Sequence, residues 1–200
     1  MAILLSKYIY IYLLGIIMKF GIQVSNPKFS GLKDPEDKTL DECIETSFLF
    51  NTETAFIVWL GVFIPLHYKY TISTILLDIL MMLQVLLDKQ DGDLDITWPS
   101  NDFNAQWNMS WQGNSLTINA QWVSVIGKTE NLLNNLGALK LSKSEFIGEW
   151  KPLLEMIIVG LNKCGYNESN VRNFKKLKEI HSRIEGTTNR IMDVRVPPHY

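Results

Sequence analysis

Side chains that commonly carry enzyme chemistry are few in this sequence and lie far apart along it. The histidines and cysteines form none of the short-spaced pairs that metal sites and redox motifs require. A cysteine beside a histidine can form a nucleophilic dyad, but Cys164 precedes Gly165, where a small packing residue is usual at a helix end. We therefore expect packing or surface roles for His67, His181, His199, Cys43 and Cys164.

Sequence motifs for phosphate binding and for a serine nucleophile are also missing from the chain. Asp91, Asp93 and Asp95 lie close together, but they lack the spacing and the later glutamate of a calcium loop. The sequence thus predicts no cofactor, no bound metal and no enzymatic activity. The alternative is an enzyme whose site is assembled by folding from scattered residues such as His67, Asp78 and Glu149.

Two polar stretches are the best candidates for contacts with another protein. One is acidic and spans residues 34–45. The other consists of polar residues that alternate with apolar ones over residues 92–125 and would cover one face of a sheet. Carboxylates on either surface would attract a basic partner. The predicted contact residues are Asp34, Glu36, Asp37, Asp41 and Glu42 in the first stretch, and Asp93, Asp95, Asn108 and Asn119 in the second.

The alternation over residues 92–125 predicts three antiparallel strands with one buried face. A two-residue turn at Gly113-Asn114 would pair Trp111 with Leu116, and a four-residue loop at Pro99–Asp102 would pair Trp98 with Phe103. The polar face would then show Asp95, Gln106 and Gln121 in one row, and Asp93, Asn108 and Asn119 in the next. The four tryptophans of this region occupy the apolar positions of the alternation, which favours core packing over ligand stacking. They are Trp98, Trp107, Trp111 and Trp122.

Patterns elsewhere predict further strands and several helices around this meander. Ser142 and Glu145 form a capping box at the start of a helical stretch that ends near Gly165, in which Pro152 would either kink one continuous helix or begin a new one. The expected strands are Phe20–Ser25, Ile44–Phe50, Thr54–Trp59 and Val62–Leu66, and the other expected helices are Ile72–Leu87, Glu130–Leu136 and residues 169–184. The predicted fold is α+β: an antiparallel sheet of about six to seven strands, with helices packed on its apolar face.

The chain is expected to form a single domain over residues 18–185, followed by an irregular tail at 186–200. Residues 1–17 form an apolar extension that contains Lys7. Three interpretations stay open for this extension: a short membrane anchor, a leader peptide, or translation from a start codon upstream of a native start at Met18. An added strand at Tyr8–Tyr12 is also open, because this run is rich in strand-forming residues.

Charge and cysteine content limit the classes of partner. The net charge of −2 does not favour nucleic acid as a partner. Basic residues on the last predicted helix fit a solvated helix face better than a nucleic-acid site. Two cysteines cannot form a disulfide framework, which is compatible with a reducing, cytoplasmic location. A membrane partner is expected only if residues 1–17 are an anchor.

Three segments together resemble the immunity proteins of bacterial polymorphic and contact-dependent toxin systems. They are WLGVFIPLHYKYTISTILLDIL at Trp59–Leu80, DLDITWPSND at Asp93–Asp102 and EWKPLLEMIIVGLNKCGY at Glu149–Tyr166. The resemblance covers residues 18–185 and has no catalytic signature. It implies a non-enzymatic cytoplasmic protein that binds one cognate toxin domain and blocks its active site. If the toxin is a nuclease, the acidic residues would take the place of phosphate groups.

Overall fold

The structure, a computed structural model, describes residues 18–185 and has an α+β fold. Its seven described strands are antiparallel, as expected, but they form two sheets instead of one. One sheet consists of β1 (Phe20–Gln23), β2 (Thr54–Trp59) and β3 (Val62–His67). The other consists of β4 (Gly92–Ser100), β5 (Phe103–Gln112), β6 (Ser115–Val125) and β7 (Leu139–Ser142). The predictions for residues 1–17 and 186–200 lie outside the described part.

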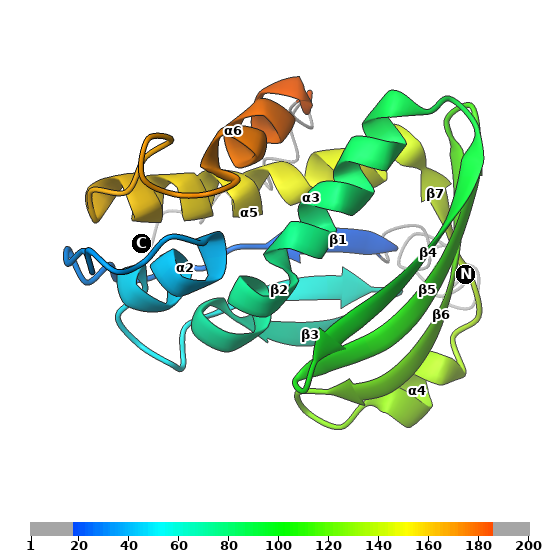
Figure 1. The fold of residues 1–200 in the computed structure, drawn as a ribbon. Helices are drawn as coiled ribbons and strands as arrows, with labels where there is room; N and C mark the ends of the chain where they lie inside the picture. Colours follow the sequence, from blue (N-terminus) through cyan, green and yellow to red (C-terminus); the bar gives the residue numbers. More distant parts are fainter. Residues whose placement is uncertain (1–17, 186–200) are drawn as a thin grey trace, which may run out of the picture.

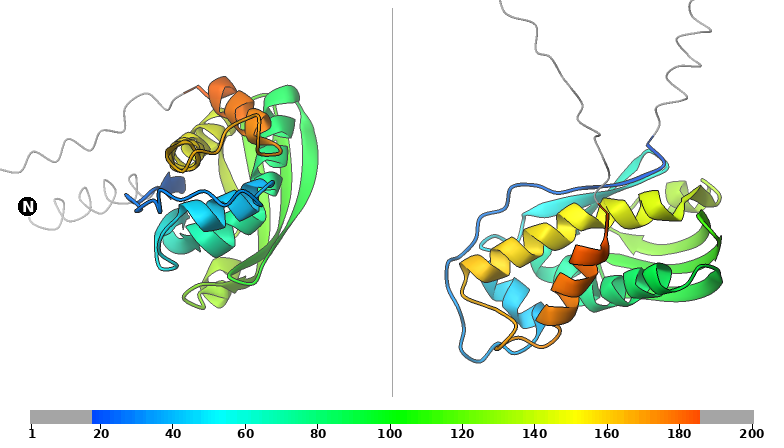
Figure 2. Two further views of the ribbon diagram at one scale, coloured as in Figure 1. Left: turned by 60° about the vertical axis from the view of Figure 1, so that its left-hand side comes forward. Right: turned by 90° about the horizontal axis from the view of Figure 1, so that it is seen from above.

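The helices lie mainly on the inner side of the four-stranded sheet. They are α2 (Leu40–Ser47), α3 (Ser73–Asp88), α4 (Glu130–Asn134), α5 (Lys143–Lys163) and α6 (Phe174–Arg183). A π-helical turn, η1 (Tyr68–Ile72), leads directly into α3. The four-stranded sheet curves along one side of the molecule, while α3, α5 and the three-stranded sheet fill its concave side (Figures 1 and 2). The opposite, convex face of this sheet therefore lies at the surface.

Aromatic rings from both sheets form the centre of the core. Trp59 of β2 reaches the concave face of the four-stranded sheet, where its ring centroid lies 4.9 Å from Trp107 and 5.2 Å from Trp122. Trp98 lies 4.9 Å from Trp107 in an edge-on arrangement. All four tryptophans predicted to face inward are buried. Burial of these rings holds the two sheets together and fixes which face of the meander turns outward.

The β5–β6 register is the predicted one, whereas the predicted β4–β5 register is wrong. Gly113-Asn114 pairs Trp111 with Leu116, as expected. The β4–β5 turn contains two residues, so Ser100 pairs with Phe103 and Trp98 pairs with Ala105. Because the error is two residues, it leaves every side chain on its predicted face.

The predicted strand Ile44–Phe50 is wrong, because most of this segment is the C-terminal part of α2. Its buried residues follow helical spacing. The Glu42 carboxylate also accepts hydrogen bonds from the backbone N–H groups of Lys38 and Thr39, which stabilises the start of the helix. The residues on the buried face of α2 are Leu40, Cys43, Ile44 and Ser47.

Two further differences concern segments near the ends of helices. The four-residue strand β7 is not expected from the sequence. The last helix begins at Phe174 instead of residue 169, because Asn167 and Asn170 form turns and Asn173 has a left-handed φ of 63°. The Ser142 capping box is confirmed, and α5 runs through Pro152 without ending.

Candidate functional site

The convex face of the four-stranded sheet is the first candidate binding surface. Of its predicted contact residues, Asp95, Asn108 and Asn119 lie in one row across β4, β5 and β6. Asp93 belongs to the next row, beside Ser110. All four predicted side chains are exposed. This surface, which we call the outer face, comprises Asp93, Asp95 and Thr97 of β4, Gln106, Asn108 and Ser110 of β5, and Thr117, Asn119 and Gln121 of β6.

The outer face has little internal bonding. The Asn108 amide donates to the Asp95 carboxylate over 2.7 Å. Among the described residues, no hydrogen bond or ion pair engages the side chain of Asp93 or Asn119. Within residues 18–185, no ion pair engages Asp93 or Asp95, and the nearest lysine in the register of the sheet is Lys140 on the far strand β7. The outer face is thus a hydrogen-bonding surface that is acidic along the β4 side.

The acidic stretch at residues 34–45 is largely occupied by local structure. The Tyr166 hydroxyl donates to the Asp37 carboxylate and accepts from the Asp34 N–H over 2.9 Å. Burial, together with the bond to Asp37, raises the pKa of Tyr166 to about 12. Hydrogen bonds from Lys38 and Thr39 lower the pKa of Glu42. These bonds join the stretch to the end of α5 and cap α2.

Two carboxylates of the acidic stretch, those of Glu36 and Asp41, have no hydrogen bond or ion pair within the described residues. The stretch lies by α2 and the C-terminal end of α5, whereas the outer face lies at the other end of the molecule (Figure 1). The structure therefore separates the predicted contact residues into two surfaces.

Among the described residues, neither thiol has a hydrogen bond to a histidine or a carboxylate. Cys43 is fully buried, and its pKa is raised to about 12 by burial and by the neighbouring acids Asp37, Glu42 and Asp41. Such a thiol stays protonated and unreactive at neutral pH. Cys164 is also buried, with its sulfur 3.8 Å from the Ser47 carbonyl oxygen.

The scattered residues of the enzyme alternative each have a separate environment. His67 Nδ1 lies 3.5 Å from Asp102, in the turn between β4 and β5. The Glu149 carboxylate accepts from the Ile22 N–H over 3.3 Å. Burial raises the pKa of Asp78 on α3. No described contact joins any two of His67, Asp78 and Glu149, so these residues form no catalytic group in this structure.

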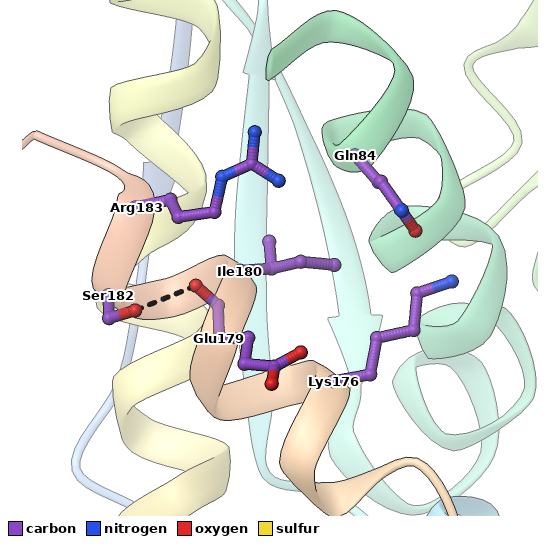
Figure 3. Close-up of a pocket in the computed structure, with 6 residues that line it drawn as sticks. All are labelled: Gln84, Lys176, Glu179, Ile180, Ser182 and Arg183. Carbon is purple, nitrogen blue, oxygen red and sulfur yellow. Dashed lines mark hydrogen bonds between the residues drawn. The ribbon is translucent and has the colours of Figure 1, made fainter. Parts of the chain in front are cut away.

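Two of the hollows on the described surface have volumes of about 240 and 290 Å³. The first lies between α3 and α6, where Gln84, Lys176 and Arg183 border it (Figure 3). Arg183 is already paired with Asp88 at 2.6 Å. The second is lined by Lys38, Glu168, Ser169, Asn170, Val171 and Arg172.

The basic face of α6 is partly neutralised by ion pairs. Lys175 lies 3.6 Å from Glu179, and Lys178 lies 2.6 Å from Glu168. Arg183 pairs with Asp88, so three basic side chains of α6 have acidic partners. This pairing lowers the positive potential that nucleic-acid binding would need.

Within residues 18–185, no group of three or more histidine, cysteine, aspartate or glutamate side chains could hold a metal ion. One described helical segment, Tyr68–Asp88, is long and apolar enough to span a membrane. In its most apolar window 56% is buried inside the fold, and buried core helices also meet these criteria. Comparisons of the chain with protein-family models, curated proteins and solved structures found no match.

Proposed function

We propose that this protein is a non-enzymatic immunity protein, which binds one cognate bacterial toxin domain and covers its active site. The observation that supports the proposal best is the outer face. It is exposed, rich in amides and carboxylates, and backed by a closely packed aromatic core. Rigid strands can present such side chains to a partner with little loss of conformational entropy on binding. This function needs no reactive group.

Charge gives the complex its expected orientation. Asp93 and Asp95 lie on the outer face and form no ion pair with the part of the chain that the structure describes. A toxin that cleaves nucleic acid needs a basic cleft to hold phosphates, and carboxylates can occupy the same positions. The acidic stretch at the other end would add to long-range attraction without touching the partner. We therefore assign direct contacts to the outer face and steering to Glu36 and Asp41.

Co-purification with the C-terminal domain of a secreted toxin encoded directly upstream tests this function. The expected result is a stable complex in which the toxin domain is inactive. Changing Asp93→Lys and Asp95→Lys together should weaken binding about 100-fold, because two cations would face a basic surface. The matched control, Glu36→Lys with Asp41→Lys, makes the same change in net charge at the other end and should weaken binding much less.

The proposal is wrong if the folded wild-type protein neither binds the toxin domain nor prevents its activity. If only the Glu36 and Asp41 variant loses binding, the binding surface is the acidic stretch.

A further inference from the structure

Strand β4 lies at the edge of the four-stranded sheet, with β5 as its only hydrogen-bonded neighbour among the described strands. An edge strand has one row of backbone N–H and C=O groups that point away from the sheet. The β4 edge is nine residues long. By contrast, the other edge strand of this sheet, β7, has four residues, and its Lys140 carbonyl accepts from the Lys19 ammonium. The long edge of the sheet is therefore at β4.

The register shows which β4 residues have outward-pointing backbone groups. In a two-residue hairpin the residues next to the turn form a hydrogen-bonded pair, and every second pair after it does the same. Ser100 and Phe103 are that pair here, so Trp98 and Ile96 also bond to β5. The residues between them point their N–H and C=O groups away from β5. Pro99 agrees with this assignment, because a proline has no N–H to offer a neighbouring strand.

Asp93, Asp95 and Thr97 are therefore the residues with unpaired backbone groups. Within residues 18–185, no hydrogen bond joins their backbone atoms to a group beyond β5. All three residues are exposed, and unpaired N–H groups in folded proteins are normally bonded to water. Their side chains lie on the outer face, so free backbone and acidic side chains coincide along one edge.

Pairing of the β4 edge with the β4 strand of a second copy of this chain is unfavourable. If two β4 strands paired, Asp93 and Asp95 of one copy would face the aspartates of the other across the new ladder. Like charges directly opposite each other in a sheet are destabilising. Opposite charges in the same positions are stabilising, so these aspartates favour a strand that carries lysine or arginine at alternate positions.

We propose that the β4 edge binds an extended segment of a partner protein, which adds a strand beside Asp93, Asp95 and Thr97 and places basic side chains against the two aspartates. The backbone bonds would supply a general affinity for extended chains, and the carboxylates would select basic ones. This inference rests on the proposed function and names the part of the toxin domain that is recognised: a basic extended segment, at or beside its active site.

A synthetic peptide provides the direct test. We suggest a fluorescein-labelled peptide of about nine residues in which lysine alternates with threonine or valine, titrated with the protein and followed by anisotropy. We expect saturable binding. One analogue replaces each lysine by glutamate, and another keeps the lysine side chains but N-methylates the lysine backbone nitrogens, which would bond to β4 in antiparallel addition because they lie opposite Asp93 and Asp95. Each analogue should bind at least about tenfold more weakly.

Variants of the protein test the same contact from the other side. Thr97→Pro removes an outward N–H and, as at Pro99, leaves the bonds to β5 intact. It should weaken binding of the lysine peptide at least about tenfold without unfolding the protein, as judged by circular dichroism. Asp93→Asn with Asp95→Asn keeps side-chain size and should also weaken binding. Val123→Ala, an exposed position on the inner strand β6 that is not part of the outer face as defined, is the control and should have little effect.

The inference is overturned if the lysine peptide does not bind, or if its N-methylated analogue binds as well as the parent. It is also overturned if sedimentation shows that wild-type protein dimerises and Thr97→Pro abolishes the dimer. The toxin complex separates the two proposals. If Thr97→Pro still binds the toxin domain normally, the strand-addition inference fails while the proposed function stands. If wild-type protein binds the peptide but not the toxin domain, the proposed function fails and the edge site remains.

Discussion

Trp107 lies in the centre of the aromatic cluster between the two sheets. Its ring meets Trp59 of β2, Trp98 of β4 and Trp122 of β6, and it is fully buried. Truncation to alanine would leave a large cavity, because neighbouring rings cannot move in far enough to fill it. We expect Trp107→Ala to lower the free energy of unfolding by about 3–5 kcal/mol, measured by urea denaturation.

The control for this prediction is Val123→Ala, which lies on the next strand with 59% of its surface exposed. It should change stability by less than about 0.5 kcal/mol. Equal effects of the two substitutions would contradict the central role of the indole cluster.

His181 should make the stability of the protein sensitive to mild acid. Within the described residues its Nε2 atom is buried without a hydrogen-bond partner, and burial, followed by the nearby Lys151, lowers its pKa. Glu155 opposes this effect only in part. Because the unfolded chain then binds a proton more readily than the fold does, stability is full above the ordinary histidine pKa of about 6.5 and decreases as the pH falls toward the lowered value.

Urea unfolding at a series of pH values would measure this dependence. His181→Gln should make the decrease below about pH 6.5 shallower. His67→Gln serves as the comparison, since His67 lies beside Asp102 and has no cationic neighbour in a described contact. A slope that His181→Gln leaves unchanged would rule out this source of acid sensitivity.

At the scale of elements, the packing of α5 depends on Gly160. A Cβ atom at this position would lie 2.6 Å from Cε1 of Phe29 and 3.4 Å from Phe48, which is too close for the first ring. Alanine normally favours a helix over glycine by about 1 kcal/mol. Here we expect the clash to dominate, so that Gly160→Ala lowers the free energy of unfolding by about 1–3 kcal/mol.

Thermal or urea unfolding would check this prediction against Asn162→Ala, an exposed position on the same helix. That control should be neutral or slightly stabilising. If Gly160→Ala were as stable as Asn162→Ala, the segment around Phe29 would not be packed against α5 as described.

Local patterns are enough to predict most elements of this fold. Alternation in the meander, the Gly113-Asn114 turn and the Ser142 capping box each act through near neighbours, and all three predictions are confirmed. Pro99 misleads the register prediction because proline is both a turn former and an edge-strand residue. The strand predicted at Ile44–Phe50 is wrong because a short apolar run does not distinguish the period of a helix from that of a strand.

The candidate site is only partly predictable for a related reason. The polar side chains and their alternation with apolar residues along each strand are sufficient to predict one exposed face. Its predicted residues are Asp93, Asp95, Asn108 and Asn119. The free β4 edge depends on which strands become neighbours, a long-range property that spacing alone does not contain. The local sequence feature that indicates this edge is Pro99, because proline within a sheet is usually found in edge strands. The division of seven strands into two sheets is hidden from local patterns for the same reason.

For the whole molecule, charge distribution predicts how a complex would form. The acidic stretch and the β4 aspartates lie at different ends, and the net charge is only −2. If the partner is the basic toxin domain that we propose, attraction to it should therefore come from local potentials, which salt screens over about 8 Å at physiological ionic strength. We expect the association rate to fall as salt is raised, with a smaller change in the dissociation rate.

Stopped-flow mixing over a salt series would measure both rates. Glu36→Gln with Asp41→Gln should flatten the salt dependence of association while leaving dissociation nearly unchanged, because these side chains are assigned no contact. Markedly faster dissociation of this variant would instead place the acidic stretch inside the interface.

The alternation along β4, β5 and β6 divides structural and recognition roles between neighbouring residues. Inward side chains of these strands form the core, whereas the outward ones have few bonds within the fold. Substitutions at outward positions can thus accumulate without unfolding the protein. Single substitutions at these outward positions could therefore change the binding specificity while the fold stays the same. Such a protein could evolve together with a partner whose own surface changes rapidly.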